Sequence, residues 1–232
     1  MGGNKISIYK DNNKRDQFLF DKWNKWLTLI YTDIQQALIN RDIFRETMAV
    51  IQANPKIHSY GTFYSWMQTV YSQAAIAAVR RQADRGKNVV SFARLLSAVG
   101  KSPTVISRER FTAYYNNGNP PEHIGHQHFD KLAGKGQSCI STAMIQQDLA
   151  LLQTKYAAIK PFANKRIAHY DQKAFHEVPT WKELDDCLDL LETLLKKYLS
   201  MFRAEIHLFI VPKRQFEWKK IFWVPWIEKQ KQ

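Results

Sequence analysis

The segment from residue 180 to residue 202 constrains the fold more strongly than any other part of the sequence. It opens with Thr180 and Glu183, spaced as in a capping box, where each side chain satisfies the other residue's backbone N–H. Eight apolar residues then recur at helical spacing for about five turns: Leu184, Cys187, Leu188, Leu191, Leu194, Leu195, Tyr198 and Phe202. A stripe of this length predicts an amphipathic helix that buries one face against other helices.

The same periodicity predicts helices along most of the chain. It covers residues 15–51, 61–84, 91–100 and 145–159. The segment 102–115 is a further candidate, because Ser102 suits the N-cap and Pro103 suits the first helical position. The sequence therefore predicts an all-α fold with four to five main helices.

Two segments do not follow the helical pattern. Residues 116–138 hold four of the nine glycines and two adjacent prolines, which predicts a loop insertion. Residues 205–232 are rich in β-branched and aromatic residues, and they suit either a short strand pair or an extended arm packed over the helices. We expect one helical domain over residues 1–204, with the aromatic and basic arm packed on the same domain.

The charge balance indicates an acidic partner. The 34 Lys and Arg residues exceed the 21 Asp and Glu residues and give a net charge of +13. Such an excess favours nucleic acid, an anionic membrane surface or an acidic protein, although many soluble proteins are simply basic. The two cysteines are isolated, and no apolar run has the length of a signal peptide or a membrane span. These features predict a cytoplasmic protein without a membrane partner.

The stretch KPFANKRIAHYDQ, residues 160–172, combines residues that suit phosphate chemistry. His169 titrates near neutrality, and Arg166, three residues earlier on the same helical face, offers a planar fork of donors to phosphate oxygens. Together they could cleave RNA without a metal, with His169 moving a proton and Arg166 stabilising the developing charge. Pro161 can kink the helix and aim the residues after it into a groove. An ordinary solvated helix face has a similar composition.

The sequence contains the stretches NKRIAHYD at 164–171, RRQADRGKNVVSFARLL at 80–96 and WNKWLTLIYTDI at 23–34. These three stretches resemble the HEPN superfamily (higher eukaryotes and prokaryotes nucleotide-binding), in its abortive-infection U-type (AbiU-like) branch. The branch typically has Arg-Arg-Leu-x-Asp where this chain has Arg-Arg-Gln-Ala-Asp, so the Leu is missing. The resemblance spans most of residues 15–204.

This resemblance implies a helical bundle that forms a homodimer and pairs two motifs across a basic cleft. It further implies a metal-independent endoribonuclease of a phage-defence or toxin–antitoxin system, with RNA as substrate and no cofactor. An antitoxin such as a nucleotidyltransferase would be a further partner.

Carried over by residue, the resemblance places His169 on the catalytic histidine and Asn164 on the polar position after the catalytic arginine. The arginine itself would stand at 163, where this chain has Ala163. Either the chain departs naturally from the pattern, or Arg166 replaces the arginine from a nearby turn, or the residue was changed deliberately. The alanine side chain has no charge and no hydrogen-bond donor with which to bind a phosphate, so we expect impaired cleavage. The residues expected to bind RNA are Lys165, Tyr170, Arg80, Arg81 and Arg85.

Other patterns support weaker alternatives. His123, His126 and His128 have a plausible metal spacing, but without a second ligand pair nearby they fit loop histidines better, and we expect no metal. Between residues 80 and 110, eight cations oppose two carboxylates, which suits either an RNA-tracking surface or a solvated face. Aromatics of the arm interleave with lysines and could stack bases, or pack in the core or at a dimer contact. Two further functions stay open: a non-catalytic dimer that binds RNA, nucleotide or a partner, and a structural subunit that meets an acidic antitoxin.

Overall fold

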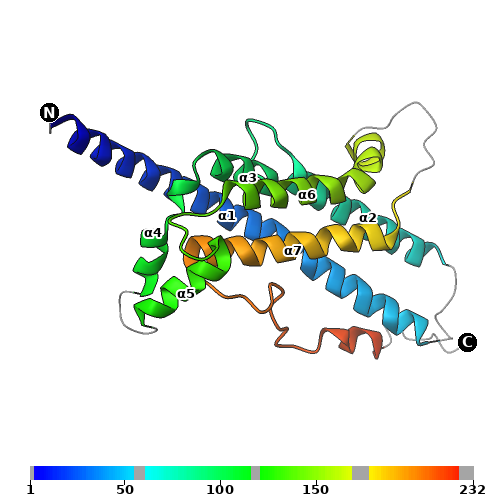
Figure 1. Cartoon of the computed structure of the whole chain (residues 1–232). Helices are drawn as coiled ribbons and strands as arrows, with labels where there is room; N and C mark the ends of the chain where they lie inside the picture. The colour runs from blue at the N-terminus through cyan, green and yellow to red at the C-terminus, as the bar shows by residue number, and fades with distance from the viewer. Residues whose placement is uncertain (1–2, 55–60, 116–120, 169–177, 225–232) are drawn as a thin grey trace, which may run out of the picture.

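The chain folds into an all-α bundle. A computed structural model describes residues 3–54, 61–115, 121–168 and 178–224 (Figure 1). The α-helices are α1 (Gly3–Gln52), α2 (Thr62–Ala83), α3 (Phe92–Lys101), α4 (Arg108–Thr112), α5 (Glu122–Ala133), α6 (Thr142–Phe162) and α7 (Trp181–Arg203). The shorter elements are the 3-10 helices η1 (Pro103–Val105), η2 (Ala113–Tyr115) and η4 (Trp218–Phe222), and the π-helix η3 (Ala163–Ala168). No β-strand occurs within these ranges, and the predicted fold class is confirmed.

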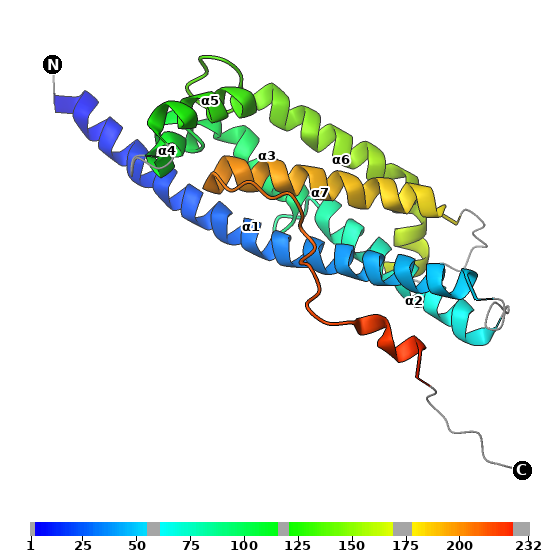
Figure 2. The ribbon, with the colours of Figure 1, turned by 90° about the horizontal axis from the view of Figure 1, so that it is seen from below.

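One long helix organises the bundle. The 50 residues of α1 span about 75 Å, and its N-terminal part extends beyond the other helices in Figure 1. Figure 2 shows α7 lying between α1 and α6, while α2 packs on both α1 and α6. Five fully buried side chains mark the shared core: Leu27 of α1, Val79 of α2, Phe92 of α3, Ile159 of α6 and Tyr198 of α7. In the described ranges no helix combines the length and the apolar character needed to cross a membrane.

The helix α7 forms where the capping box predicts it. Thr180 Oγ1 accepts a hydrogen bond from the Glu183 backbone N–H at 3.2 Å, and the Thr180 N–H donates to Glu183 Oε2 at 2.8 Å. Downstream, the predicted apolar stripe is buried from Leu184 to Phe202. The helix ends at Arg203, and the C-cap residue Ala204 adopts a left-handed conformation with φ 54°.

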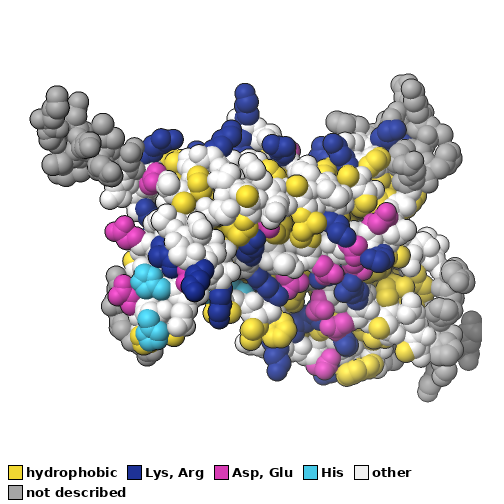
Figure 3. All heavy atoms as spheres, viewed as in Figure 1, with side chains coloured by type: hydrophobic (Ala, Val, Ile, Leu, Met, Phe, Trp, Pro, Cys, Tyr) yellow, Lys and Arg dark blue, Asp and Glu magenta, His cyan; other side chains and the backbone are white. Residues whose placement is uncertain are grey.

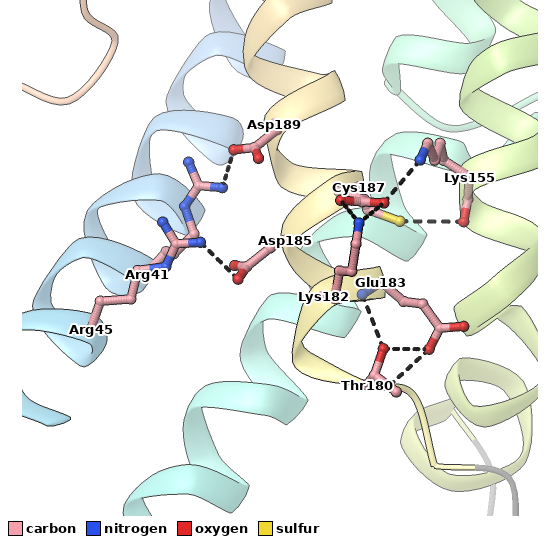
Figure 4. A network of polar contacts seen from close by, with 10 residues as sticks. Arg41, Arg45, Lys155, Thr180, Lys182, Glu183, Asp185, Cys187 and Asp189 are labelled. Atoms are coloured by element: carbon pink, nitrogen blue, oxygen red, sulfur yellow. Dashed lines mark hydrogen bonds and ion pairs between the residues drawn. The ribbon is translucent and has the colours of Figure 1, made fainter. Parts of the chain in front are cut away.

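The polar sides of α7 hold it to two neighbours (Figure 4). Asp189 forms an ion pair with Arg41 of α1, with 2.6 Å between Oδ1 and the guanidinium. Asp186 pairs with Lys155 of α6 at 3.0 Å. Most carboxylates of this helix are thus engaged by cations of the bundle itself. These ion pairs hold α7 against α1 and α6.

The prediction of a loop over residues 116–138 is wrong for residues 122–133, which form α5. Gly125, Phe129 and Ala133 are four residues apart and all three are buried, so a helical stripe is present among the polar residues. Gly125 permits the close approach of α5 to Tyr115, because a Cβ there would lie only 2.7 Å from the tyrosine ring. The glycine and proline content outweighed this short stripe in the sequence-based prediction.

The segment 102–115 is helical, as predicted, but it is broken into three short pieces. Ser102 and Pro103 begin η1 as expected. The chain then turns at Ser107, whose side chain caps α4 by accepting a hydrogen bond from the Arg110 backbone N–H at 3.2 Å. Ser107 also forms an isolated antiparallel bridge with Cys139, which fixes this break against the segment before α6.

The C-terminal arm, which the structure describes as far as residue 224, is extended chain followed by η4. It lies along α1 and α7: Gln35 donates to the Ile210 carbonyl and Lys196 to the Leu208 carbonyl, each at 2.8 Å. Arg214 is hydrogen-bonded to Asp42 of α1 at 2.8 Å. In this described part the arm is the extended form and not the strand pair.

Candidate functional site

The motif that carries the predicted chemistry begins in a π-helix. Pro161 lies in the last turn of α6 and has no backbone N–H to continue the regular hydrogen-bond ladder. Directly after it, residues Ala163–Ala168 form the wider turn η3. Figure 2 shows the chain turning away from the axis of α6 at this point, so the predicted change of helical course after Pro161 is present. His169 and Tyr170 lie outside the described residues, and so does the predicted shared face of Arg166 and His169.

The second motif lies where α2 ends. Asp84 follows the last residue of α2, and its carboxylate accepts a hydrogen bond from the Gly86 backbone N–H at 2.7 Å. The Ser91 hydroxyl donates to the Asp84 carbonyl and also caps α3 by accepting from the Arg94 N–H at 3.0 Å. These contacts close the connection between α2 and α3 and fix the end of α2.

A buried glutamine ties this end of α2 to two other helices. Gln82 is 3% exposed, and its amide Nε2 donates to Asp33 Oδ2 of α1 at 2.6 Å. Its Oε1 accepts from the Phe92 backbone N–H, the first donor of α3, at 3.0 Å. Asp33 also accepts from Arg81 at 2.6 Å. Sequence reasoning missed Asp33 and Gln82, although a lone carboxylate inside the apolar pattern of 23–34 was a usable signal.

The two motifs meet at a cavity of about 290 Å³ between α2 and α6, here named the α2–α6 pocket. Arg80 of α2 donates from Nε to Oδ1 of Asn164, the second residue of η3, with 3.4 Å between the two atoms. This contact joins the resemblance stretch at 80–96 to the stretch at 164–171. The pocket is lined by Arg80, Ala83, Asp84, Arg85, Gln153, Tyr156, Lys160 and Asn164.

The α2–α6 pocket carries a net positive charge, because three cations (Arg80, Arg85 and Lys160) face one carboxylate (Asp84). Within the part of the chain that the structure describes, neither Arg85 nor Lys160 forms an ion pair. Burial raises the pKa of the Tyr156 hydroxyl while the Arg80 guanidinium opposes that shift, so the hydroxyl stays neutral at physiological pH. Figure 3 shows Lys and Arg side chains along the upper edge of the molecule, and Asp and Glu mixed with further Lys and Arg lower down.

The pocket includes some of the predicted site residues and excludes others. Arg80, Arg85 and Asn164 line it. Arg81 does not, because its guanidinium pairs with Asp33. Lys165 and Arg166 are half-buried and do not line the pocket; Arg166 makes a long contact of 3.5 Å to the Lys165 carbonyl.

Ala163 is fully buried among core side chains, so its methyl group presents nothing to the pocket. Sequence reasoning also missed the contribution of α6 to the pocket. Gln153, Tyr156 and Lys160 share one helical face with Asn164, since they are spaced by three and four residues. That spacing was visible in the sequence, but the apolar stripe of the same helix obscured it.

The histidines of α5 do not converge. His128 packs inward, with Nδ1 2.7 Å from the Tyr115 hydroxyl and Nε2 3.0 Å from the Ser200 hydroxyl, and burial lowers its pKa. His123 and His126 are exposed on the outer side of the helix. No cluster of three or more potential metal ligands is found among the described residues.

Comparison with known proteins identifies the family. The sequence profile of the HEPN_AbiU2 family, described as AbiU2, matches residues 20–209. This range includes α2 to α7, the part of α1 from residue 20 onward, and both motifs that meet at the α2–α6 pocket. No curated protein and no solved structure gives a significant match. Since the matched range covers well over half of the chain, the protein belongs to the AbiU2 branch of the HEPN domain proteins.

Proposed function

We propose that this chain is a metal-independent HEPN endoribonuclease of a phage-defence or toxin–antitoxin system, impaired in cleavage because Ala163 occupies the position of the catalytic arginine. The observation that carries the proposal is the contact between Arg80 and Asn164, which joins two family motifs at one cationic pocket. A basic pocket next to the segment that leads to His169 suits a phosphodiester substrate. As in the sequence-based expectation, the working form is a cytoplasmic homodimer with RNA as substrate and an antitoxin, such as a nucleotidyltransferase, as a further partner.

The reaction follows from the chemistry of RNA. A 2′-hydroxyl attacks the adjacent phosphorus, the bond to the 5′-oxygen breaks, and the products are a 2′,3′-cyclic phosphate and a 5′-hydroxyl end. The role assigned to His169 is to move the proton between these oxygens. An arginine at position 163 would stabilise the negative charge that gathers on the phosphate oxygens. Loss of one such donor typically costs a factor of about 10²–10³ in rate.

At position 163, only a long side chain could reach a phosphate and stabilise its charge. In a helix the Cα–Cβ bonds tilt toward the N-terminus, so a side chain at 163 leans toward the turn of α6 that carries Lys160. Lys160 lines the α2–α6 pocket. An arginine stem could therefore pass through the buried position of Ala163 and place its guanidinium at the pocket, at a packing cost of about 1–3 kcal/mol.

The buried methyl group of Ala163 favours one alternative function. With a cationic pocket but no guanidinium at this position, the chain as given would bind RNA or nucleotide without cutting it. The structural-subunit alternative has no comparable observation in its favour.

The test is an RNA cleavage assay with and without EDTA on the chain as given and on Ala163→Arg. We expect weak or absent cleavage by the first and EDTA-resistant cleavage, with a cyclic phosphate product, by the second. Ala163→Met is the matched control, because it adds a similar stem without the guanidinium. His169→Ala added to Ala163→Arg should abolish cleavage. If Ala163→Arg folds, dimerises and still cuts no RNA, the non-catalytic binding function replaces the proposal.

A further inference from the structure

We propose that the α2–α6 pocket is a phosphate-binding subsite, complete within one protomer, that holds RNA through Arg85 and Lys160. This inference rests on the proposed function for the identity of the ligand. It adds two residues outside 163–169, Arg85 and Lys160, to a pocket that Asn164 also lines. Arg85 and Lys160 belong to elements far apart in the sequence, and the packing of α2 against α6 brings them to one cavity.

The first argument is electrostatic. Many basic residues of this chain are already engaged by the protein: Arg81 pairs with Asp33, and Arg108 pairs with Asp130. In contrast, Arg85 and Lys160 form no ion pair within the described ranges, although both line the same cavity. The pocket is lined by three cations and only one carboxylate, Asp84, so part of the positive charge is unbalanced, and a bound anion would lower the repulsion between the cations. The net positive charge of the pocket therefore favours an anionic ligand.

The second argument is the nature of the neutral lining groups. Gln153 is anchored by its Nε2, which donates to the Ala83 carbonyl at 3.0 Å. Asn164 is held by Arg80, and the Tyr156 hydroxyl stays neutral because burial raises its pKa. Amide and hydroxyl groups of this kind can donate to phosphate and ribose oxygens without adding charge. The pocket thus offers both charge and directional hydrogen bonds.

The third argument is size. A volume of about 290 Å³ corresponds to roughly ten water molecules at their liquid density. This is more than one phosphate group occupies, and it leaves room for the sugar attached to that phosphate. A phosphate with its ribose is the repeating unit of an RNA backbone and also the body of a free nucleotide. The shared chemistry is the sugar phosphate, and the experiment separates the two sources.

The probe is a short fluorescein-labelled oligouridylate, whose anisotropy is measured over a range of salt concentrations. Lys160→Met and Arg85→Gln remove one charge each at exposed positions, while Lys160→Arg keeps the charge. Lys213→Met is the matched control, because Lys213 is also exposed but lies on the C-terminal arm. Unfolding temperatures of all variants show whether each protein is folded.

We expect Lys160→Met and Arg85→Gln to weaken binding roughly tenfold or more at low salt, because each loses a charged hydrogen bond to phosphate. Each should also lower the slope of log K against log salt by about 0.7. Lys160→Arg should bind like the parent, and Lys213→Met should change the affinity much less. Equal losses in Lys160→Met and Lys213→Met, or parental affinity in both pocket variants, would overturn the proposal.

Competition identifies the source of the phosphate. If uridine 5′-monophosphate or inorganic phosphate displaces the oligomer from the parent but not from Lys160→Met, the pocket takes a terminal phosphate. If neither competes while both pocket variants lose the oligomer, it takes an internal phosphodiester. The cleavage assay on Ala163→Arg is scored separately. If the pocket binds phosphate but Ala163→Arg does not cleave RNA, the subsite is supported and the proposed function fails. If Ala163→Arg cleaves RNA equally well with and without Lys160 and Arg85, the proposed function is supported and the subsite fails.

Discussion

Replacing Gln82 with leucine should destabilise the bundle and weaken RNA binding together. Gln82 is 3% exposed and makes two hydrogen bonds, one to the charged Asp33 at 2.6 Å and one from the Phe92 N–H at 3.0 Å. A bond to a charged group contributes about 1.5–3 kcal/mol and a neutral one about 0.5–1.5 kcal/mol. Leucine regains part of this by burying apolar surface, so a net loss of about 2–3 kcal/mol is expected. In a domain of this size that lowers Tm by roughly 4–12 °C.

The assay is thermal unfolding followed by circular dichroism, with Gln36→Leu as the control. Gln36 lies on the exposed side of α1, and its side chain bonds to Asn40 of the same helix and to no other residue that the structure describes. Its replacement should therefore change Tm by about 2 °C or less. Since Gln82 fixes the end of α2 that carries Arg80, the affinity for oligouridylate should fall as well. Equal Tm values for the two variants would refute the argument that Gln82 joins α1, α2 and α3.

Two further predictions concern α5 and the oligomeric state. Gly125→Ala should lower the free energy of unfolding by about 1–3 kcal/mol, because its Cβ would lie 2.7 Å from the Tyr115 ring. Gly100→Ala is the control: its Cβ would meet Ile145 at 3.5 Å, so the free energy of unfolding should stay the same or rise. Chemical denaturation of both variants measures the difference. Light scattering at micromolar concentration should give a dimer of the 27.2 kDa chain, because Phe63, Trp66 and Val70 are exposed on one side of α2; a stable monomer would contradict this.

The helices were predictable where the sequence contains a long stripe and a clear boundary. The capping box at Thr180 and the stripe up to Phe202 gave α7 almost to the residue. The helix α5 was not predictable by the same logic, because its stripe of Gly125, Phe129 and Ala133 is short and contains a glycine. Gly125 also packs against Tyr115, a tertiary contact that the local sequence pattern does not reveal.

The candidate site was predictable in its residue types and only in part in its geometry. The resemblance indicated Arg80, Arg85 and Asn164, which the fold brings to one cavity. It could not indicate that Arg81, the neighbour of Arg80, turns away to pair with Asp33, since that depends on the packing of α2 against α1. Lys160 was overlooked for the same reason, because its place at the pocket depends on the packing of α6 against α2.

The most direct test of the account is photocrosslinking of the chain to an oligoribonucleotide that contains 4-thiouridine, followed by mass spectrometry of the crosslinked peptides. The account predicts crosslinks in the peptide that holds Arg80 and Arg85 and in the α6 peptide that holds Tyr156, both lost on competition with unlabelled RNA. Crosslinks confined to the aromatic residues of the C-terminal arm, such as Phe216 and Trp223, would contradict it. In that case RNA would lie on the arm and not at the α2–α6 pocket.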